Sequence, residues 1–187
     1  MRPNKRDELV RNALQVFYRD GFHATGMDKL VVETGVSKTS MYKHFRTKEE
    51  LILAALRLRD ESFRISLLRQ IEEMAHSPAD RLLASFDALA QWFEEDGYRG
   101  CMFIKAGAEY QESDHPIHLQ AAEHKRLMLD YFTDLARKAG AREPEKLGCQ
   151  ILLLQEGAIV TAVLLKNCEP ARDAKAAAQV LLDQALA

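Results

Sequence analysis

The sequence has few of the residues that mark secreted or membrane proteins. Only three of its 187 residues are cysteine (Cys101, Cys149 and Cys168), an odd number at wide spacing. No disulfide framework is indicated, and a reducing cytoplasm is the expected location. The most apolar segment, 151–165, is interrupted by Gln155 and Glu156. It is shorter than the roughly 18 apolar residues of a membrane span, so we expect no membrane partner.

Enzyme motifs are absent as well. The sequence contains no glycine-rich phosphate loop, no GxSxG motif and no HExxH motif. His115 and His118 have i, i+3 spacing, but no further ligands accompany them at metal-ligand spacing, so a helix cap or a solvated pair is preferred. Residues 1–6 are polar and lack the apolar core of a signal peptide. We expect a protein that is not an enzyme and has no cofactor and no metal.

The charge is unevenly distributed along the chain. The formal net charge is only −2, yet residues 1–48 hold ten Lys and Arg against five Asp and Glu. The remaining residues hold sixteen against twenty-three and are acidic. A general polyanion binder would spread its positive charge, whereas this chain concentrates it at one end, as expected for a nucleic-acid-binding domain joined to an acidic partner domain.

Residues 21–54 are the most informative stretch. Thr25, followed by Asp28 three positions later, predicts a capping box at the start of a short helix. Gly35 predicts a turn through positive φ, and Ser37 predicts the cap of a second short helix that carries polar and basic residues. Two short helices joined by a glycine-containing turn indicate a helix-turn-helix, whose second helix enters the major groove of DNA.

This stretch resembles the DNA-binding domain of the tetracycline-repressor (TetR) family of transcriptional regulators. The matching positions are Gly21-Phe22, Thr25, Gly35-Val36-Ser37-Lys38, Met41-Tyr42, His44-Phe45 and Lys48-Glu49-Glu50-Leu51. One departure is Thr39, where the family frequently has glycine; its hydroxyl adds a group that can read bases. The resemblance covers about the first third of the chain and implies binding to double-stranded operator DNA.

The residue types of the second short helix fit DNA contacts. Lys38 can reach a phosphate or a guanine edge, and Thr39 and Ser40 can donate to phosphate or touch a thymine methyl. The resemblance implies six DNA contacts: Thr25, Lys38, Thr39, Tyr42, His44 and Lys48. Ser37, Ser40 and Lys43 complete the candidate set. Met41 and Phe45, spaced i, i+4, are expected on the opposite, buried face.

The rest of the chain predicts further helices and no strands. Apolar spacing and Pro or Gly punctuation predict helices at about 5–20, 47–74, 101–110, 115–139 and 144–166. A further helix begins at Ser77-Pro78 and has an apolar stripe that reaches Phe93, and a last one runs from Pro170 almost to the end of the sequence. With the two short helices this gives an all-α fold of about nine helices. We expect a helix-turn-helix domain at 1–48 and an effector-binding and dimerisation domain at 49–187.

The helix predicted at 144–166 is apolar nearly all round, which indicates burial on every side. Either it is the central helix of a monomeric bundle or one side meets a second subunit; the resemblance and two-fold operators favour a homodimer. The candidate dimer interface is Leu153, Ile159, Val160, Val163, Leu164, Ala174, Ala177 and Ala178.

Aromatic and methionine residues between 86 and 132 suit the lining of an apolar effector cavity, with ordinary core as the alternative. The candidate effector-binding residues are Phe86, Trp92, Phe93, Cys101, Phe103, Tyr110, His124, Met128, Tyr131 and Gln155. His124 is either satisfied by a core partner or orients a ligand, and Glu109 is a further candidate for the second role. The family resemblance implies a repressor that a small-molecule effector releases from DNA. Because no cluster of inward basic residues is apparent, we expect this effector to be small and mostly apolar.

Two other interpretations remain open. Cys101 follows Arg99 and precedes a predicted helix, so the cation and the helix dipole favour a thiolate that senses electrophiles or oxidants. The alternative is a buried, inert thiol, and Cys149 and Cys168 are expected to be packing residues or bystanders. A constitutive DNA-binding protein without an effector is the more distant possibility.

Overall fold

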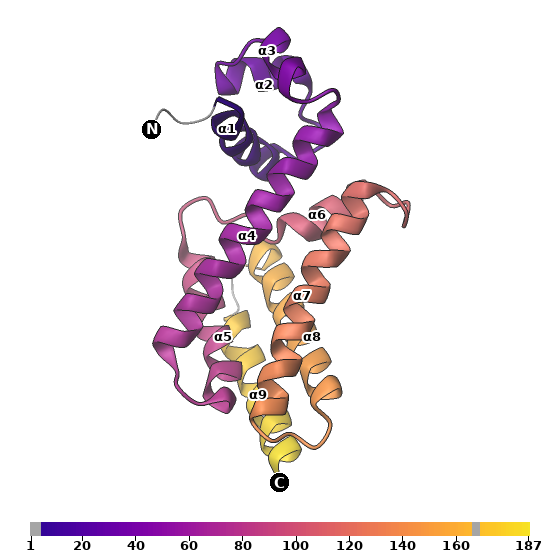
Figure 1. The fold of residues 1–187 in the computed structure, drawn as a ribbon. Helices are drawn as coiled ribbons and strands as arrows, with labels where there is room; N and C mark the ends of the chain where they lie inside the picture. The colour runs from indigo at the N-terminus through magenta and orange to yellow at the C-terminus, as the bar shows by residue number, and fades with distance from the viewer. Residues whose placement is uncertain (1–4, 166–168) are drawn as a thin grey trace. The chain divides into compact units, whose positions relative to one another are not determined.

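The computed structural model describes residues 5–165 and 169–187. Within these ranges all regular secondary structure is helical, which confirms the predicted all-α fold (Figure 1). The described part of the chain contains nine helices: α1 (Lys5–Asp20), α2 (Met27–Thr34), α3 (Lys38–His44), α4 (Lys48–Met74), α5 (Pro78–Glu94), α6 (Met102–Glu109), α7 (Pro116–Lys138), α8 (Pro144–Leu164) and α9 (Pro170–Leu186). Cys168 lies outside the described residues.

Local chemistry explains where the helices begin and end. Gly35 ends α2 with φ of 68°, and its N–H donates to the carbonyl of Val31, as its position predicted. At the start of α4 the Glu50 N–H donates to the Thr47 hydroxyl at 3.2 Å, while the Glu50 carboxylate accepts from the Arg46 N–H at 2.7 Å. The pair is a variant of the capping box, because Glu50 accepts from the residue before the N-cap Thr47 rather than from Thr47 itself.

The capping box predicted at Thr25 is wrong. The N-cap of α2 is Gly26, with no side-chain capping bond. Thr25 is fully buried, and its hydroxyl donates to the carbonyl of Gly21 at 2.7 Å. The hydroxyl therefore supplies a donor to a backbone carbonyl just after α1 and does not accept an N–H from the first turn of α2.

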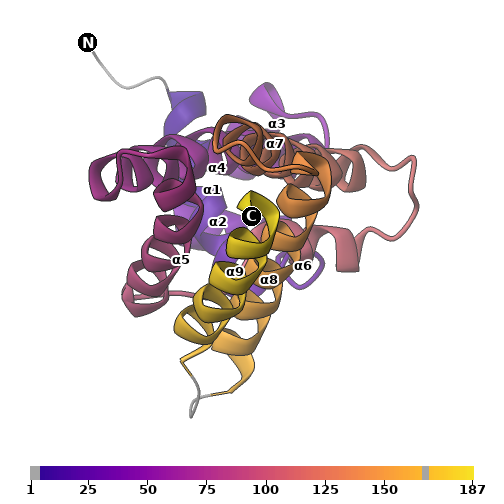
Figure 2. The same cartoon turned by 90° about the horizontal axis from the view of Figure 1, so that it is seen from below.

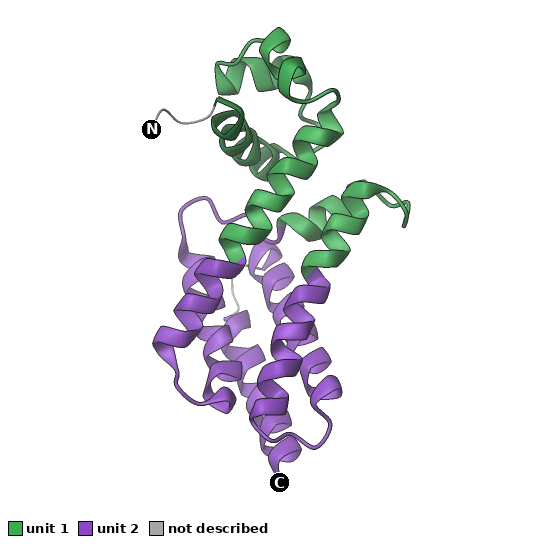
Figure 3. Cartoon of the chain, in the orientation of Figure 1, with its two compact units in different colours: residues 1–63, 102–124 green, residues 64–101, 125–187 purple. Residues whose placement is uncertain are grey.

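The chain forms two compact units (Figure 3). Unit 1 comprises residues 1–63 and 102–124, and unit 2 comprises residues 64–101 and 125–187. These limits differ from the predicted domain boundary after residue 48, because α4 continues without interruption and α6 belongs to the same compact unit as α1–α3. The division of function at residue 48 stays a prediction.

The core of unit 1 is built on the predicted inward stripe of α1. Leu9, Ala13, Val16 and Phe17 are all buried, as the helical spacing of the sequence predicted. Apolar residues from the following elements complete this core: Phe22, Leu30, Met41, Phe45, Leu51 and Ile52. The helix-turn-helix is therefore held by a continuous apolar core, which fixes the direction of α3.

Unit 2 is a helical bundle in which α8 and α9 lie side by side and both contact α5 (Figure 2). Large buried residues of this unit include Phe86, Leu82, Phe132, Ile151 and Leu182. Ser77 caps α5 by accepting the Asp80 N–H, and Pro78 lies in the first turn of this helix.

Candidate DNA-binding surface

The inner face of α3 is fixed by packing. Ser37 has extended backbone angles and its hydroxyl accepts the Ser40 N–H at 3.3 Å, so it caps α3 as predicted. Met41 is fully buried and Phe45 is 5% exposed, which confirms both as core residues. Because these two side chains anchor one side, the other side of the helix must face away from the core.

The opposite side of α3 carries exposed polar and basic side chains. We call this set the α3 outer face: Ser37, Lys38, Thr39, Tyr42, Lys43 and His44. Ser40, also a candidate contact, is only half-buried. The α3 outer face contains hydrogen-bond donors, two lysines and no carboxylate, the composition that base edges and phosphates require.

Lys38 has an acidic neighbour on α2. Its Nζ lies 2.9 Å from an Asp28 carboxylate oxygen, and this hydrogen bond raises the pKa of Lys38. Both side chains are exposed, so the pair is a weak surface ion pair. A phosphate or a guanine edge can therefore replace Asp28 as the partner of the ammonium group.

Two predicted DNA contacts lie differently from the α3 outer face. The Thr25 side chain is fully buried, as described above, so the structure does not offer its hydroxyl to DNA. Lys48 is half-buried, and its Nζ donates to the carbonyl of Phe22 at 3.0 Å. An ammonium group has three donors, so Lys48 keeps donors for a phosphate while it also holds the turn after α1.

Glu109, a further candidate for orienting a ligand, contacts the chain between α1 and α2. Its carboxylate oxygens accept the N–H groups of Phe22 and His23, at 3.0 and 2.6 Å. A residue considered as a ligand-orienting group therefore contacts the helix-turn-helix instead. Sequence reasoning missed this contact because the partners are more than 80 residues apart and no local motif links them.

The candidate effector residues divide between the two units. Phe103, Tyr110 and His124 belong to unit 1; Phe86, Trp92, Phe93, Cys101, Met128, Tyr131 and Gln155 belong to unit 2. Most are buried, but Tyr131 and Phe93 are partly exposed. The burial of these side chains is expected both for residues that line an effector cavity and for ordinary core residues.

Some of these candidate effector residues already have hydrogen-bond partners within the protein. His124 Nδ1 lies 2.7 Å from an Asp60 carboxylate oxygen, and its ring stacks on Phe103 with centroids 3.8 Å apart. This supports the interpretation of His124 as a histidine satisfied by a core partner. The Gln155 amide donates to the buried Ser85 hydroxyl. His115 Nδ1 faces the Ile117 N–H at 3.2 Å at the start of α7, which fits a helix cap.

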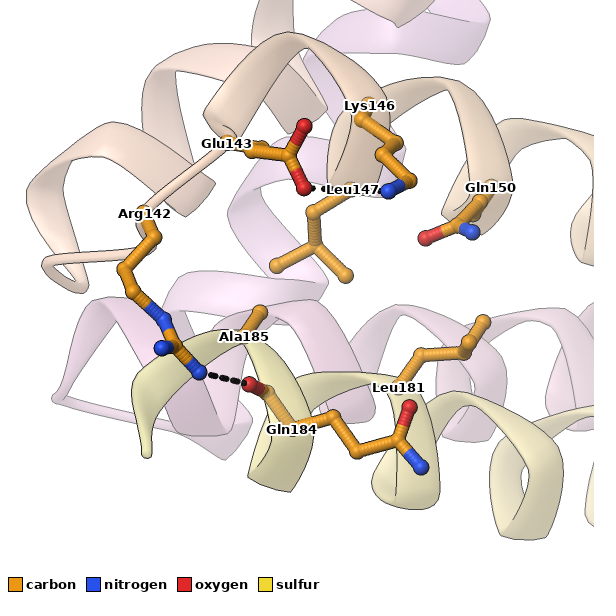
Figure 4. Close-up of a pocket in the computed structure, with 8 residues that line it drawn as sticks. All are labelled: Arg142, Glu143, Lys146, Leu147, Gln150, Leu181, Gln184 and Ala185. Carbon is orange, nitrogen blue, oxygen red and sulfur yellow. Dashed lines mark hydrogen bonds and ion pairs between the residues drawn. The ribbon is translucent and has the colours of Figure 1, made fainter.

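A polar pocket of about 250 Å³ opens in unit 2, between the first turns of α8 and the end of α9 (Figure 4). Its lining residues are Arg142, Glu143, Lys146, Leu147, Gln150, Leu181, Gln184 and Ala185. Charged groups there pair with each other or with backbone, as Lys146 does with Glu143 and Arg142 with the Gln184 carbonyl. None of the candidate effector residues lines this pocket.

The apolar helix α8 is not buried on all sides. On α8, Leu153 and Leu164 are 66% and 71% exposed, and Val160 and Val163 are exposed as well. On α9, Val180 is exposed. We call these five residues the α8–α9 apolar surface. Other predicted interface residues, Ile159, Ala174 and Ala178, are instead buried within unit 2, while Ala177 is exposed. Clusters of exposed apolar residues are typical of surfaces that contact another protein.

Within the described ranges, α8 is the one helix long and apolar enough to cross a membrane by length and composition. One such helix is weak evidence, because the core helix of a water-soluble bundle meets the same criteria. In this chain Leu147, Ile151 and Ile159 of α8 are buried against the rest of unit 2.

Comparison with known proteins agrees with this geometry. Residues 9–55 match the family model of bacterial regulatory proteins of the tetR family, and residues 78–178 match the tetracyclin repressor-like C-terminal domain. The chain is 25% identical to a crystallised TetR-family transcriptional regulator from Streptomyces coelicolor, with a TM-score of 0.91 over 99% of this chain and 92% of that one.

Curated relatives are also regulators. The chain is 37% identical over 100 residues to the HTH-type transcriptional activator FasR from Mycolicibacterium smegmatis, covering 52% of this chain and 45% of FasR. It is 23% identical over 155 residues to the HTH-type transcriptional regulator YjdC from Escherichia coli, covering 83% of this chain and 81% of YjdC. The chain thus spans less than half the length of FasR but most of YjdC.

A capped helix with an outward polar face, followed by a helical bundle, is the arrangement of a transcriptional regulator with a helix-turn-helix DNA-binding domain. The matched family models cover both parts of the chain, the second alone more than half of it. The chain belongs to the TetR family of transcriptional regulators.

Proposed function

We propose that the protein is a homodimeric, cytoplasmic repressor that binds palindromic operator DNA and leaves it when a small, mostly apolar effector binds. The observation that carries the DNA-binding part is the α3 outer face, with Lys38, Thr39, Tyr42 and Lys43 exposed on a helix anchored by Met41. The excess of Lys and Arg in residues 1–48 supplies the attraction to phosphates that such a helix needs.

The α8–α9 apolar surface supports the dimer. A water-soluble monomer gains nothing from exposing Leu153, Val160 and Leu164 along one helix, whereas a second copy of the chain would bury them. A two-fold dimer presents two α3 helices. They match successive major grooves when they are about 34–36 Å apart.

An unsatisfied hydroxyl in unit 2 supports a ligand there. Among the described residues the buried Tyr131 hydroxyl has no hydrogen-bond partner, and burial together with the nearby Glu72 raises its pKa to about 12. Leaving such a group unpaired costs roughly 1–3 kcal/mol, so a ligand that pairs with it gains affinity. The aromatic neighbour Phe132 fits an effector that is apolar apart from one polar group.

Helix α4 runs from the helix-turn-helix into unit 2 without a break. A change caused by effector binding in unit 2 could therefore be transmitted along this helix to the helix-turn-helix. In the proposed mechanism, a ligand-dependent shift of α4 changes the separation of the two α3 helices and weakens operator binding. FasR is named as an activator, so a reporter gene placed behind the operator is needed to decide the sign of regulation.

The experiment is a thermal-shift screen of small apolar compounds, followed by DNA-release assays on those that stabilise the protein. We expect stabilising compounds to release the operator, and Tyr131→Phe to weaken both effects. A protein that binds operator DNA but responds to no compound in either assay would favour a constitutive DNA-binding protein.

A second candidate function, sensing of electrophiles by Cys101, is favoured by one contact. Cys101 is 8% exposed, and its Sγ accepts a hydrogen bond from Lys125 Nζ at 3.2 Å. Lys125 also pairs with Glu156 at 2.7 Å. Burial lowers the pKa of Lys125, but the interactions with Cys101 and Glu156 outweigh burial and raise the pKa. An ammonium group within hydrogen-bond distance of the sulfur is a neighbour typical of reactive cysteines.

Iodoacetamide labelling followed residue by residue tests this candidate. If Cys101 is a sensor, it should label at neutral pH faster than the exposed Cys149 despite its burial, and Cys101→Ser should abolish release of DNA by electrophiles. Faster labelling of Cys149, together with normal release in Cys101→Ser, would leave a buried, inert thiol.

A further inference from the structure

The chain between α1 and α2, residues 21–26, is held by side chains from two other helices of unit 1. We call it the α1–α2 turn. Its central residue, Phe22, is fully buried, and its ring lies 5.7 Å from that of Phe17 and 6.3 Å from that of Tyr110. The Phe22 carbonyl accepts from Lys48 of α4, while its N–H donates to Glu109 of α6, both at 3.0 Å. Charged groups of opposite sign thus satisfy both backbone groups of one residue.

Glu109 makes a second bond to the same turn. One carboxylate oxygen accepts the Phe22 N–H, and the other accepts the His23 N–H at 2.6 Å and lies 3.3 Å from the His23 ring nitrogen Nδ1. Hydrogen bonds to an ionised acceptor are about twice as strong as neutral ones. Gly21 has φ of 86°, and a Cβ at this position would lie 3.0 Å from the carboxylate, so glycine lets Glu109 approach.

One helical turn earlier on α6, Lys105 contacts the end of α1. Its Nζ donates to the carbonyl of Tyr18 at 3.2 Å and lies 5.1 Å from the centre of the Tyr18 ring. A cation is favourable at the C-terminal end of a helix, where carbonyl groups are unpaired. Lys105 and Glu109 are i, i+4 neighbours on one face of α6. This face therefore holds the last turn of α1 and the residues that follow it.

We propose that Glu109 is a positioning residue for operator binding. It fixes the α1–α2 turn, and through that turn the placement of α2 and α3, although it lies outside the matched helix-turn-helix segment 9–55. Without this carboxylate two adjacent N–H groups lose their acceptors and the turn gains freedom. DNA binding must then order the turn again, which lowers affinity. The inference rests on the DNA-binding function and needs no effector.

Whether removal of the Glu109 carboxylate weakens or strengthens DNA binding distinguishes a positioning role from a purely electrostatic one. Removing a negative charge from a DNA-binding protein should strengthen binding if only the charge mattered. We expect the opposite for Glu109→Ala: affinity for the duplex that the wild-type protein selects from a random library falls at least about tenfold, or about 1.4 kcal/mol. The dependence of affinity on salt should not change, because no phosphate contact is lost.

Two variants provide the comparison. Glu112→Ala removes the same charge from an exposed position three residues further on and should bind as tightly as the wild type or slightly more tightly. Glu109→Gln keeps one oxygen acceptor and should fall between the wild type and Glu109→Ala. Hydrogen exchange of the Phe22 and His23 amides should follow the same order, with the fastest exchange in Glu109→Ala.

Undiminished affinity in Glu109→Ala, or an equal loss in Glu112→Ala, would overturn the proposal. If Glu109→Ala loses helicity, Glu109→Gln decides: weakened binding at wild-type helicity supports the proposal, and wild-type affinity overturns it. A wild-type protein that selects no duplex would contradict the DNA-binding function. Unchanged exchange at Phe22 and His23 in Glu109→Ala would by itself overturn the positioning role.

Discussion

Val160→Glu is expected to convert a dimer into a folded monomer and to abolish operator binding. Val160 is 42% exposed in the single chain, so a glutamate there is hydrated as long as the chain stays alone. In the proposed dimer the same carboxylate would be buried without a partner, at a cost of several kcal/mol. Because Val160 is exposed in the single chain, we expect dissociation of the dimer rather than unfolding of the chain.

Sedimentation velocity and circular dichroism at micromolar concentration measure this outcome. Ile65→Glu, on an α4 position that is 62% exposed, should leave both assembly and helicity unchanged. Ile159→Glu, one residue from Val160 but only 6% exposed, should unfold unit 2 instead. A Val160→Glu protein that remains dimeric would show that the α8–α9 apolar surface is not the interface.

Lys43→Ala is expected to weaken binding to selected and random duplexes alike. Lys43 is exposed in the last turn of α3, and its ammonium group is suited to a phosphate rather than to a base edge. Loss of one phosphate contact per subunit should flatten the slope of log affinity against log salt by about one for each subunit. Lys48→Ala is a less clear test, because Lys48 also holds the Phe22 carbonyl.

Binding titrations at several salt concentrations measure this slope. Lys138→Ala, on the last turn of α7, removes an equal charge and should leave the slope unchanged. Thr39→Ala should change the preferred operator sequence while keeping the slope, because a threonine at the start of the recognition helix is placed to read bases. An unaltered slope in Lys43→Ala would remove Lys43 from the DNA contacts.

The helices were predictable because their signals are local. The α1 stripe of Leu9, Ala13 and Phe17 and the glycine at the end of α2 depend only on neighbours in sequence. Thr25 was placed wrongly because its hydroxyl had two acceptable uses, a cap on α2 or a bond to the Gly21 carbonyl. Burial in the folded unit, which sequence does not reveal, decided between them.

The candidate site was predictable in part. The α3 outer face follows from helical periodicity once Met41 and Phe45 are recognised as core. The apolar pattern of α8 could not distinguish residues that fill unit 2, such as Ile151, from exposed ones, such as Leu153, because both are equally apolar. Glu109 and Lys105 contact partners more than 80 residues away, and such pairs leave no trace in the periodicity of a single sequence.

The most direct test of the central claim is selection of duplexes from a random library by the wild-type protein, followed by sedimentation of the complex with the selected duplex. We predict enrichment of a palindrome whose half-sites are centred about 10 base pairs, or one helical turn, apart, bound by two chains. Failure to enrich any sequence, or enrichment of an asymmetric site bound by a single chain, would contradict a two-fold DNA-binding regulator.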